Sequence, residues 1–290
     1  ARVAMISAKR ISTLLIPLLR RTRVLPATVA RPPGNELVPD TGGTITVRVR
    51  QPRTANVQNT PGADISGNIT AINEVGVDVT LQHLYDAALI TDEELSLSVV
   101  DFGAQVTEPQ VAAVAAGCED QVAAAMNGVT ADETDLDDTN VKAKILAARE
   151  ALSDAEVPAG DRFCAVSPSA ATLVLGIDEF VRADATGAAT ALREAIIGRL
   201  FGFTFVESPA LTSTSMVFYH RSGFAFAQRA PQSPRGAADS AVVNTDGLAL
   251  RQIMQYDPHR LSDQSVVSAF AGASVVDSNR VYKVTGATEA

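Results

Sequence analysis

The sequence is poor in the residues from which cofactor pockets and disulfide scaffolds are built. It contains no Trp, only 5% aromatic residues, three His and two Cys in 290 positions. Both cysteines fall in apolar runs, so we expect buried thiols in a protein of a reducing compartment. No His has a carboxylate or cysteine at metal-ligand spacing. The longest uncharged run, residues 163–177, is too short to span a bilayer and includes a proline.

Catalytic motifs are also missing. The chain has no phosphate-binding glycine loop, nucleophile elbow or zinc-protease helix. The acidic run 132–138 lacks the central glycine and the distal glutamate of a calcium loop, so we interpret it as a solvated loop. A nucleophilic pair made of Cys164 and His220 requires a fold that brings the two together. We therefore predict no enzymatic activity, cofactor or metal, and keep a soluble α/β enzyme using Cys164 or a His as a remote alternative.

Negative charge is missing from one end of the chain. The formal net charge is −9, yet the first 35 residues carry seven basic residues and no acid. The basic residues of this arm include Lys9, Arg10, Arg20, Arg21 and Arg23. A basic arm on an acidic body is typical of an element that contacts a polyanion or an acidic neighbour. Its Leu/Ile face favours docking on protein, and a solvated amphipathic terminus is the alternative.

Two alternating segments, residues 44–51 and 75–81, predict a β-ribbon around the polar loop 53–73. An isolated ribbon is marginally stable in water, so we expect it to lie on the body of the molecule or on another subunit. Its arginines are candidates for ion pairs with acids of a neighbour, each pair individually weak. The candidate contact residues are Arg48, Arg50 and Arg53 on the ribbon, and Glu108, Glu119 and Asp120, or the acidic run, on the neighbour.

A long helix is predicted over residues 101–128, where apolar residues recur three and four apart in an alanine-rich run. Pro109 either begins or kinks it, and Gly128 ends it. Before it, the capping-box pattern from Thr91 to Glu94 predicts a short helix. The remaining expected elements are helices at 141–152, 169–175 and 190–200, strands at 163–166, 203–206, 250–256, 265–270 and 281–284, and a hairpin of 216–220 with 224–228.

Several short blocks in this order resemble a known family. They are Val77-Asp78-Val79-Thr80-Leu81, Thr91-Asp92-Glu93-Glu94-Leu95 with Asp101-Phe102, and the stretches 197–203, 218–227 and 251–257. Together they resemble the major capsid (coat) proteins of tailed bacteriophages, whose capsid fold is shared with herpesviruses and encapsulins. The resemblance implies an α+β fold with an N-terminal arm (1–41), an extended β-ribbon loop (42–81), a peripheral domain (82–155) with spine helix 101–128, an axial domain (156–247), and C-terminal strands (248–290) returning through the peripheral to the axial domain.

The resemblance also implies a function. Copies of the chain would assemble as hexamers and pentamers into an icosahedral shell around double-stranded DNA, bound without sequence specificity and without a membrane. Portal and scaffolding proteins, and a cementing or decoration protein, are the further partners implied, and assembly would occur in the host bacterial cytoplasm. An encapsulin-like compartment is the alternative. Some relatives join subunits through a loop lysine and an asparagine; the lysines here are Lys9, Lys142, Lys144 and Lys283, so we expect no such link.

Overall fold

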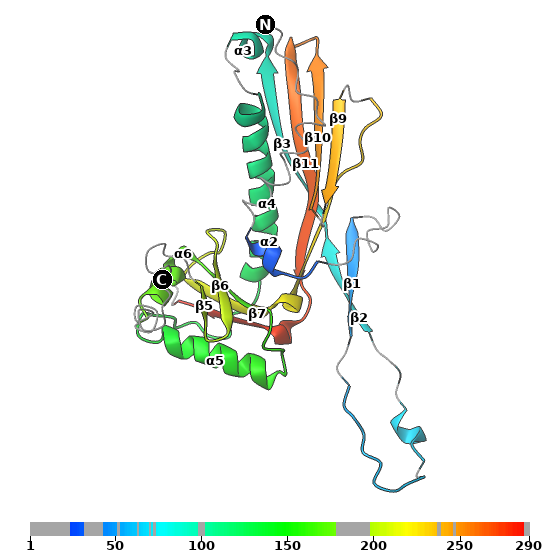
Figure 1. Ribbon diagram of the computed structural model, residues 1–290, viewed down its shortest axis with the longest axis vertical. Coiled ribbons are helices and arrows are strands. Elements are labelled where there is room, and N and C mark those ends of the chain that lie inside the picture. Colours follow the sequence, from blue (N-terminus) through cyan, green and yellow to red (C-terminus); the bar gives the residue numbers. More distant parts are fainter. Residues whose placement is uncertain are drawn as a thin grey trace.

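The computed structural model describes residues 24–31, 43–50, 53–62, 64–69, 71, 74–97, 102–177, 198–236, 239–245 and 248–286 (Figure 1). An elongated body holds two β-sheets and a long helix, and a two-stranded ribbon projects from it. This mixed architecture confirms the predicted α+β class. The predicted arm up to residue 23 and residues 190–197 of a predicted helix lie outside the described residues.

The first sheet is antiparallel and forms the long half of the body. Its strand order is β3 (Gln82–Thr91), β11 (Ser262–Val275), β10 (Leu248–Asp257) and β9 (Asp239–Thr245). Strand β8 (Phe224–Arg229) pairs with the far end of β11, from Phe270↔Arg229 to Val275↔Phe224. The 14-residue strand β11 is thus long enough to pair with β3 along most of its length and with β8 at its C-terminal end.

The second sheet has the order β12–β7–β4–β6–β5. Its strands are β12 (Val281–Thr285), β7 (Ser215–His220), β4 (Arg162–Val166), β6 (Phe203–Glu207) and β5 (Arg199–Leu200). Only β4 and β6 are parallel, and α6 (Pro168–Leu175) follows β4. Helices α5 (Val141–Asp154) and α6 cover this sheet, with Ile145, Leu152 and Val174 wholly or almost wholly buried in one core cluster.

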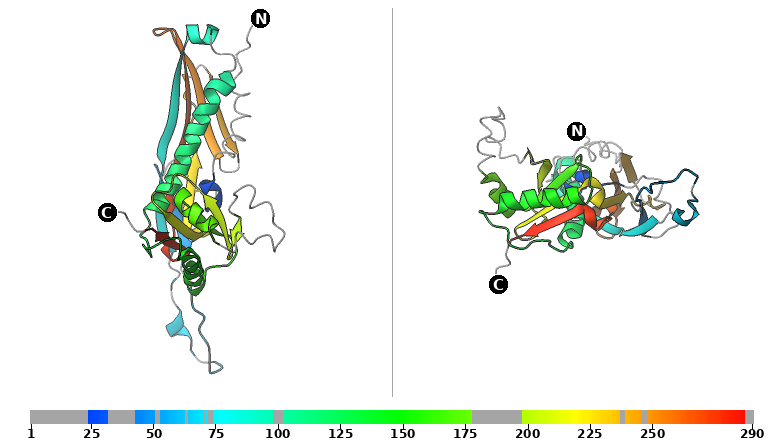
Figure 2. Two further views of the ribbon diagram at one scale, coloured as in Figure 1. Left: turned by 90° about the vertical axis from the view of Figure 1, so that its left-hand side faces the viewer. Right: turned by 90° about the horizontal axis from the view of Figure 1, so that it is seen from below.

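Helix α4 (Glu108–Asn127) packs along β11 and β3 (Figure 2, left). Pro109 lies in the first turn of α4, at its junction with the helical residues before it. Residues Gly103–Thr107 before it form a π-helical turn that the periodicity did not indicate. The short helix α3 (Asp92–Leu97) has the predicted capping box: the Glu94 carboxylate accepts from Thr91 N and Oγ1, both at 3.0 Å.

The predicted hairpin of residues 216–220 and 224–228 is wrong. Both strands exist, but β7 pairs with β4 and β12 in the second sheet, whereas β8 pairs with β11 in the first. The 3₁₀ turn Arg221–Gly223 therefore carries the chain from one sheet to the other. Residues 199–200, expected to end a helix, form β5, and strands β3 and β9 were not anticipated.

Two buried basic side chains, those of Arg162 and Lys283, donate hydrogen bonds to backbone carbonyls at the C-terminal ends of helices. The Arg162 side chain donates to the carbonyls of Leu152, Val157 and Pro158 and to Ser153 Oγ at the end of α5. Burial lowers the pKa of Arg162, with Arg149 adding to the effect.

In the described part of the chain, no helix is long and apolar enough to cross a lipid bilayer.

The second cation, Lys283, lies in β12 and is 8% exposed. Its Nζ donates to Asn127 O at 2.7 Å and Val129 O at 2.9 Å, and its backbone N–H donates to Asp132 Oδ2. A positive charge at this end of α4 is favourable because the helix dipole is negative there. Burial lowers the pKa of Lys283.

Candidate inter-subunit surfaces

The ribbon consists of β1 (Thr44–Arg50) and β2 (Glu74–Thr80), antiparallel from Thr44↔Thr80 to Arg50↔Glu74. Its base is fixed to the body: Ile45 and Val79 are 4% and 0% exposed and pack on Ala225 and Ala227 of β8. Beyond the strands the chain continues away from the body (Figure 1). We call residues 53–71 the ribbon loop; every one whose exposure is described is exposed. The predicted ribbon is thus confirmed, and its base packs on the body of the molecule as expected. The described residues of the ribbon loop, in contrast, are not buried against the described body.

The ribbon passes very close to β11 where it leaves the body. A Cβ added at Gly272 would lie 2.1 Å from Thr80 O, 2.9 Å from Thr80 C and 3.3 Å from Leu81 Cα. All three are backbone atoms. The absence of a side chain at Gly272 therefore lets the ribbon cross β11 at this level.

The ribbon loop carries few charges and exposes three aliphatic side chains among its polar residues. Val57, Ile65 and Ile69 are 81%, 56% and 74% exposed. Residues 53–73 contain only two charged residues, Arg53 and Asp64. Depletion of charge together with exposed apolar side chains is typical of the core of a protein–protein interface. The loop therefore has the composition of a contact surface.

Two of the three predicted ribbon arginines, Arg48 and Arg53, are exposed. The Arg48 side chain is 76% exposed, and its Nη1 lies 3.8 Å from Glu74 Oε2. Arg50 is the last residue of β1, in register with Glu74, and Arg53 is exposed in the ribbon loop. An exposed pair at 3.8 Å contributes little stability, so Arg48 can exchange its partner at small cost.

The predicted acidic partners are not all on the surface. Glu108 and Asp120 are exposed on α4. Glu119 is 8% exposed; its Oε1 accepts from Ser208 Oγ at 2.6 Å and its Oε2 from Val24 N at 3.2 Å. The structure therefore gives Glu119 partners within the chain. The helical spacing of Ala115, Glu119 and Val122 places this acid on the apolar face, a signal that could have separated it from Asp120.

The arm is held to the body where it becomes described. Residues Leu25–Thr28 form α2, with Leu25 and Val29 fully buried against α4 and β8 residues. Thr28 Oγ1 and Tyr219 OH share a hydrogen bond of 2.5 Å, and Ala30 bridges to β8. This docking agrees with the prediction that the arm needs protein burial. The arm's basic residues Lys9, Arg10, Arg20, Arg21 and Arg23 lie outside the described residues.

The acidic run, predicted to be a solvated loop, makes ion pairs and a hydrogen bond with the body of the molecule. Lys144 Nζ lies 2.5 Å from Glu133 Oε2 and 2.6 Å from Asp135 Oδ1, and Tyr282 OH donates to Glu133 Oε1 at 2.8 Å. The hydrogen bond from Lys144 is the largest cause that lowers the pKa of Glu133. The same contacts, with Asp135 first, raise the pKa of Lys144. Asp135 is still 68% exposed, so part of the run remains available to a partner.

The geometry gives no support to the enzyme alternative. Cys164 is fully buried in the core beside Phe218, and burial raises the pKa of its thiol well above the usual value. A nucleophilic cysteine needs the opposite shift. Burial also lowers the pKa of His220, whose Nδ1 is paired with Ser222 Oγ at 2.7 Å. Among the described residues, no three His, Cys, Asp or Glu side chains are grouped in a way that could hold a metal ion.

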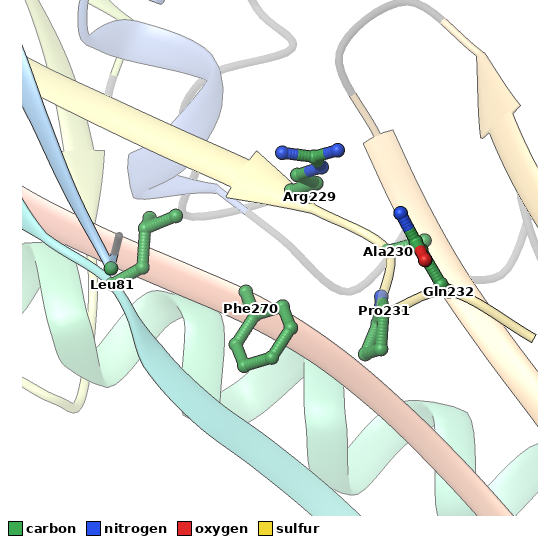
Figure 3. Close-up of a pocket in the computed structure, with 7 residues that line it drawn as sticks. Leu81, Arg229, Ala230, Pro231, Gln232 and Phe270 are labelled. Atoms are coloured by element: carbon green, nitrogen blue, oxygen red, sulfur yellow. The ribbon is translucent and has the colours of Figure 1, made fainter. Parts of the chain in front are cut away.

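A pocket lies at the base of the ribbon, and we call it the base pocket. Its volume is about 320 Å³. Phe270 lies between Leu81 and Pro231 in the view of Figure 3, with Arg229 at one side. The lining residues are Gly43, Leu81, Arg229, Ala230, Pro231, Gln232 and Phe270. The sequence did not indicate this pocket, because its walls come from four segments far apart in the chain.

Solved structures of similar fold are phage and particle shells. A structure of Mycobacterium phage Che8 matches with a TM-score of 0.65 and 21% identity over 90% of both chains. The capsid of cyanophage P-SCSP1u matches with a TM-score of 0.60 and 13% identity over 85% of this chain and 84% of that one. A virus-like particle from Pyrococcus furiosus matches with a TM-score of 0.54 and 11% identity over 95% and 98%. A comparison with curated proteins gives no significant match. These likenesses establish the fold.

The family is established by a separate comparison of sequence. The family model described as phage capsid protein matches residues 97–286, about two thirds of the chain. That stretch includes α4, both sheets except for β3, and the helices that cover them. The match favours a phage shell over the encapsulin-like alternative, and it identifies a structural component of the virion capsid. The chain belongs to the phage capsid protein family.

Proposed function

We propose that copies of this chain assemble, as pentamers and hexamers, into a closed icosahedral shell that encloses phage double-stranded DNA. The observation that carries the proposal is the ribbon loop: about twenty residues, exposed throughout their described part, poor in charge and carried away from the body on a firmly anchored ribbon. Such a loop is stable in a shell because a neighbouring copy covers it.

The parts of the chain would take the roles expected from the resemblance. The first sheet with α4 would form the peripheral domain, the second sheet with α5 and α6 the axial domain, and residues 42–81 the extended loop. The bounds of the two domains then differ from the contiguous ranges 82–155 and 156–247 that the resemblance implied. Because β8 and β9 join the first sheet while α5 and β12 join the second, each domain is assembled from separate segments of the chain. The axial domain would meet its copies around the five-fold and quasi-six-fold axes.

The arginines of the ribbon would pair with acids of the neighbouring copy. Arg48 and Arg53 are exposed on the ribbon. The exposed acids are Glu108 and Asp120 on α4 and Asp135 in the acidic run. Weak pairs suit a shell, since many reversible contacts allow errors in assembly to be corrected while their number gives strength. Glu119 is left out of this set because Ser208 and Val24 already bind its carboxylate.

The remaining partners follow from the family. A negative body suits a container whose packed DNA must stay free of tight contacts. The basic arm either faces that DNA or binds a neighbour, and the burial of Leu25 and Val29 favours binding to protein. Portal and scaffolding proteins, and a decoration protein, are the other proposed partners, with assembly in the cytoplasm of the host bacterium.

The first test is the size of the particles. The chain is expressed alone, purified gently and examined by light scattering and negative-stain microscopy, with and without a candidate scaffolding protein. Closed shells of megadalton mass are the expected result. A dimer or small ring that persists under every assembly condition would contradict the proposal.

The second test reverses charge on the ribbon. The double variant Arg48→Glu/Arg50→Glu should abolish shells and leave a folded chain with the circular dichroism spectrum of the wild type. The matched control is Arg149→Glu, an exposed arginine on α5 far along the chain from the ribbon. Normal shells from the double variant would refute the role of these arginines.

A further inference from the structure

The base pocket is an apolar recess on the surface of the molecule beside the anchored end of the ribbon. We propose that it receives Ile65 from the ribbon loop of a neighbouring copy. This inference rests on the proposed shell and specifies which surface of one copy binds which residue of the next.

The chemistry of the pocket requires an apolar occupant. Leu81, Pro231 and Phe270 supply apolar parts of its walls, and the Phe270 ring packs on the His83 ring at a centroid distance of 4.7 Å. The side facing Gln232 is fixed, because Arg251 Nη1 donates to Gln232 O at 2.8 Å. A hollow of about 320 Å³ bounded by such groups is filled most favourably by an aliphatic side chain.

The ribbon loop offers such a side chain on a rigid turn. Residues Ser66–Asn68 form a 3₁₀ turn in which Asn68 N donates to Ile65 O at 2.9 Å. The Asp64 carboxylate accepts from Ser66 N at 2.9 Å and Ser66 Oγ at 2.8 Å. Ile65 is therefore presented, 56% exposed, from a structure already ordered before binding, which reduces the entropy lost on contact.

Charge agrees with this pairing. Asp64 is the only acid of the ribbon loop and precedes Ile65. Arg229 lies on the wall of the base pocket. When Ile65 enters the pocket, the carboxylate of Asp64 approaches a positively charged rim, so the contact has an electrostatic component that fixes its orientation.

The occupant must come from another copy. The pocket includes Gly43 and Leu81, which are the two ends of the ribbon's own base. Seven paired residues on each strand separate that base from the loop, which is roughly 20 Å at about 3.3 Å per residue. A loop cannot return to its own base across an extended ribbon. A contact in which one surface binds a different surface of the next copy forms a ring when the rotation between copies closes, and a capsomer is such a ring.

Disulfide trapping between two variants tests the inference. Chains with Ile65→Cys and chains with Gln232→Cys are co-assembled, and the shells are oxidised mildly and run on a non-reducing gel. The two natural cysteines are buried and give no background. We expect a dimer at twice the 30.3 kDa chain mass in the mixed shells and in neither variant alone. The matched control mixes Ile65→Cys with Asp154→Cys, an exposed site on α5, and should give no dimer.

Each outcome decides between the alternatives. Mixed shells that form normally but give no dimer would overturn the inference and leave the shell itself intact; the pocket would then bind another part of the chain or a different protein. Wild-type chains that form no shells would instead count against the proposed function. If the cysteine variants alone fail to assemble, Ile65→Glu and Ile65→Leu replace them. Assembly lost with Glu and kept with Leu supports the pocket contact, and shells from Ile65→Glu refute it.

Discussion

Replacing Gly272 by alanine should strain the point at which the ribbon leaves the body. The added Cβ would lie 2.1 Å from Thr80 O, whereas carbon–oxygen contacts across neighbouring strands are normally about 3.3–3.6 Å. The obstructing atoms belong to the backbone, so no rotamer change relieves the contact. β2 and β11 must therefore separate by more than about 1 Å at this crossing.

The magnitude can be bounded from the packing. Overpacking of this kind typically costs about 1–3 kcal/mol. Lifting the ribbon base off β8 instead would expose Ile45 and Val79, whose burial stabilises by about 1.5–3 kcal/mol each. The chain takes the cheaper response, so we expect a loss of about 2–3 kcal/mol. For a chain of this size that lowers the melting temperature by roughly 4–6 °C.

The assay is thermal unfolding of the unassembled chain, followed by circular dichroism, together with the yield of shells. Gly160→Ala is the matched control, because a Cβ there meets nothing within 4 Å. It should change stability by less than about 0.5 kcal/mol. If Gly272→Ala melts within about 1 °C of this control, the reasoning from the crossing is wrong.

Three further results are expected. Arg162→Met should cost about 2–3 kcal/mol in urea unfolding, because it leaves buried carbonyls at the end of α5 without a donor; an unchanged midpoint would refute this. Glu133 has a lowered pKa in the folded chain, so its stabilising contribution is complete above its usual pKa of 4.5 and is lost as pH falls through the folded value. The stability difference between wild type and Glu133→Gln should therefore shrink between pH 5 and pH 3, and a constant difference would contradict the assignment. Because the lysine-free ribbon offers no amine, intact shells should dissolve in denaturant to a single band near 30.3 kDa, whereas a covalent ladder would show another cross-link.

Local pattern was enough to predict the elements whose signals are local. The long helix expected over residues 101–128, the ribbon strands and the late strands follow from periodicity, capping and turn residues. The order of short blocks was enough to indicate the family. What these signals share is that each is complete within a short stretch of sequence.

Pairing and burial across the chain could not be predicted in the same way. Strands β7 and β8 are each buried along almost their whole length, and the three-residue turn between them looks the same in the sequence as a hairpin turn. Which strand pairs with which is decided by β4, β11 and β12, and the separation in sequence reaches 70 residues for Thr285 and Ser215. The hidden position of Glu119 depends likewise on Ser208 and Val24.

The attachment of Lys283 to the end of α4 has a consequence for the order of events during synthesis. Residues 127–133 receive their partners from β12, which the ribosome releases about 150 residues later. Until then the end of the long helix lacks the cation that binds its last carbonyls, and the second sheet lacks its edge strand β12. The surface that this part of the subunit offers to a neighbour is therefore complete only when nearly the whole chain has been made.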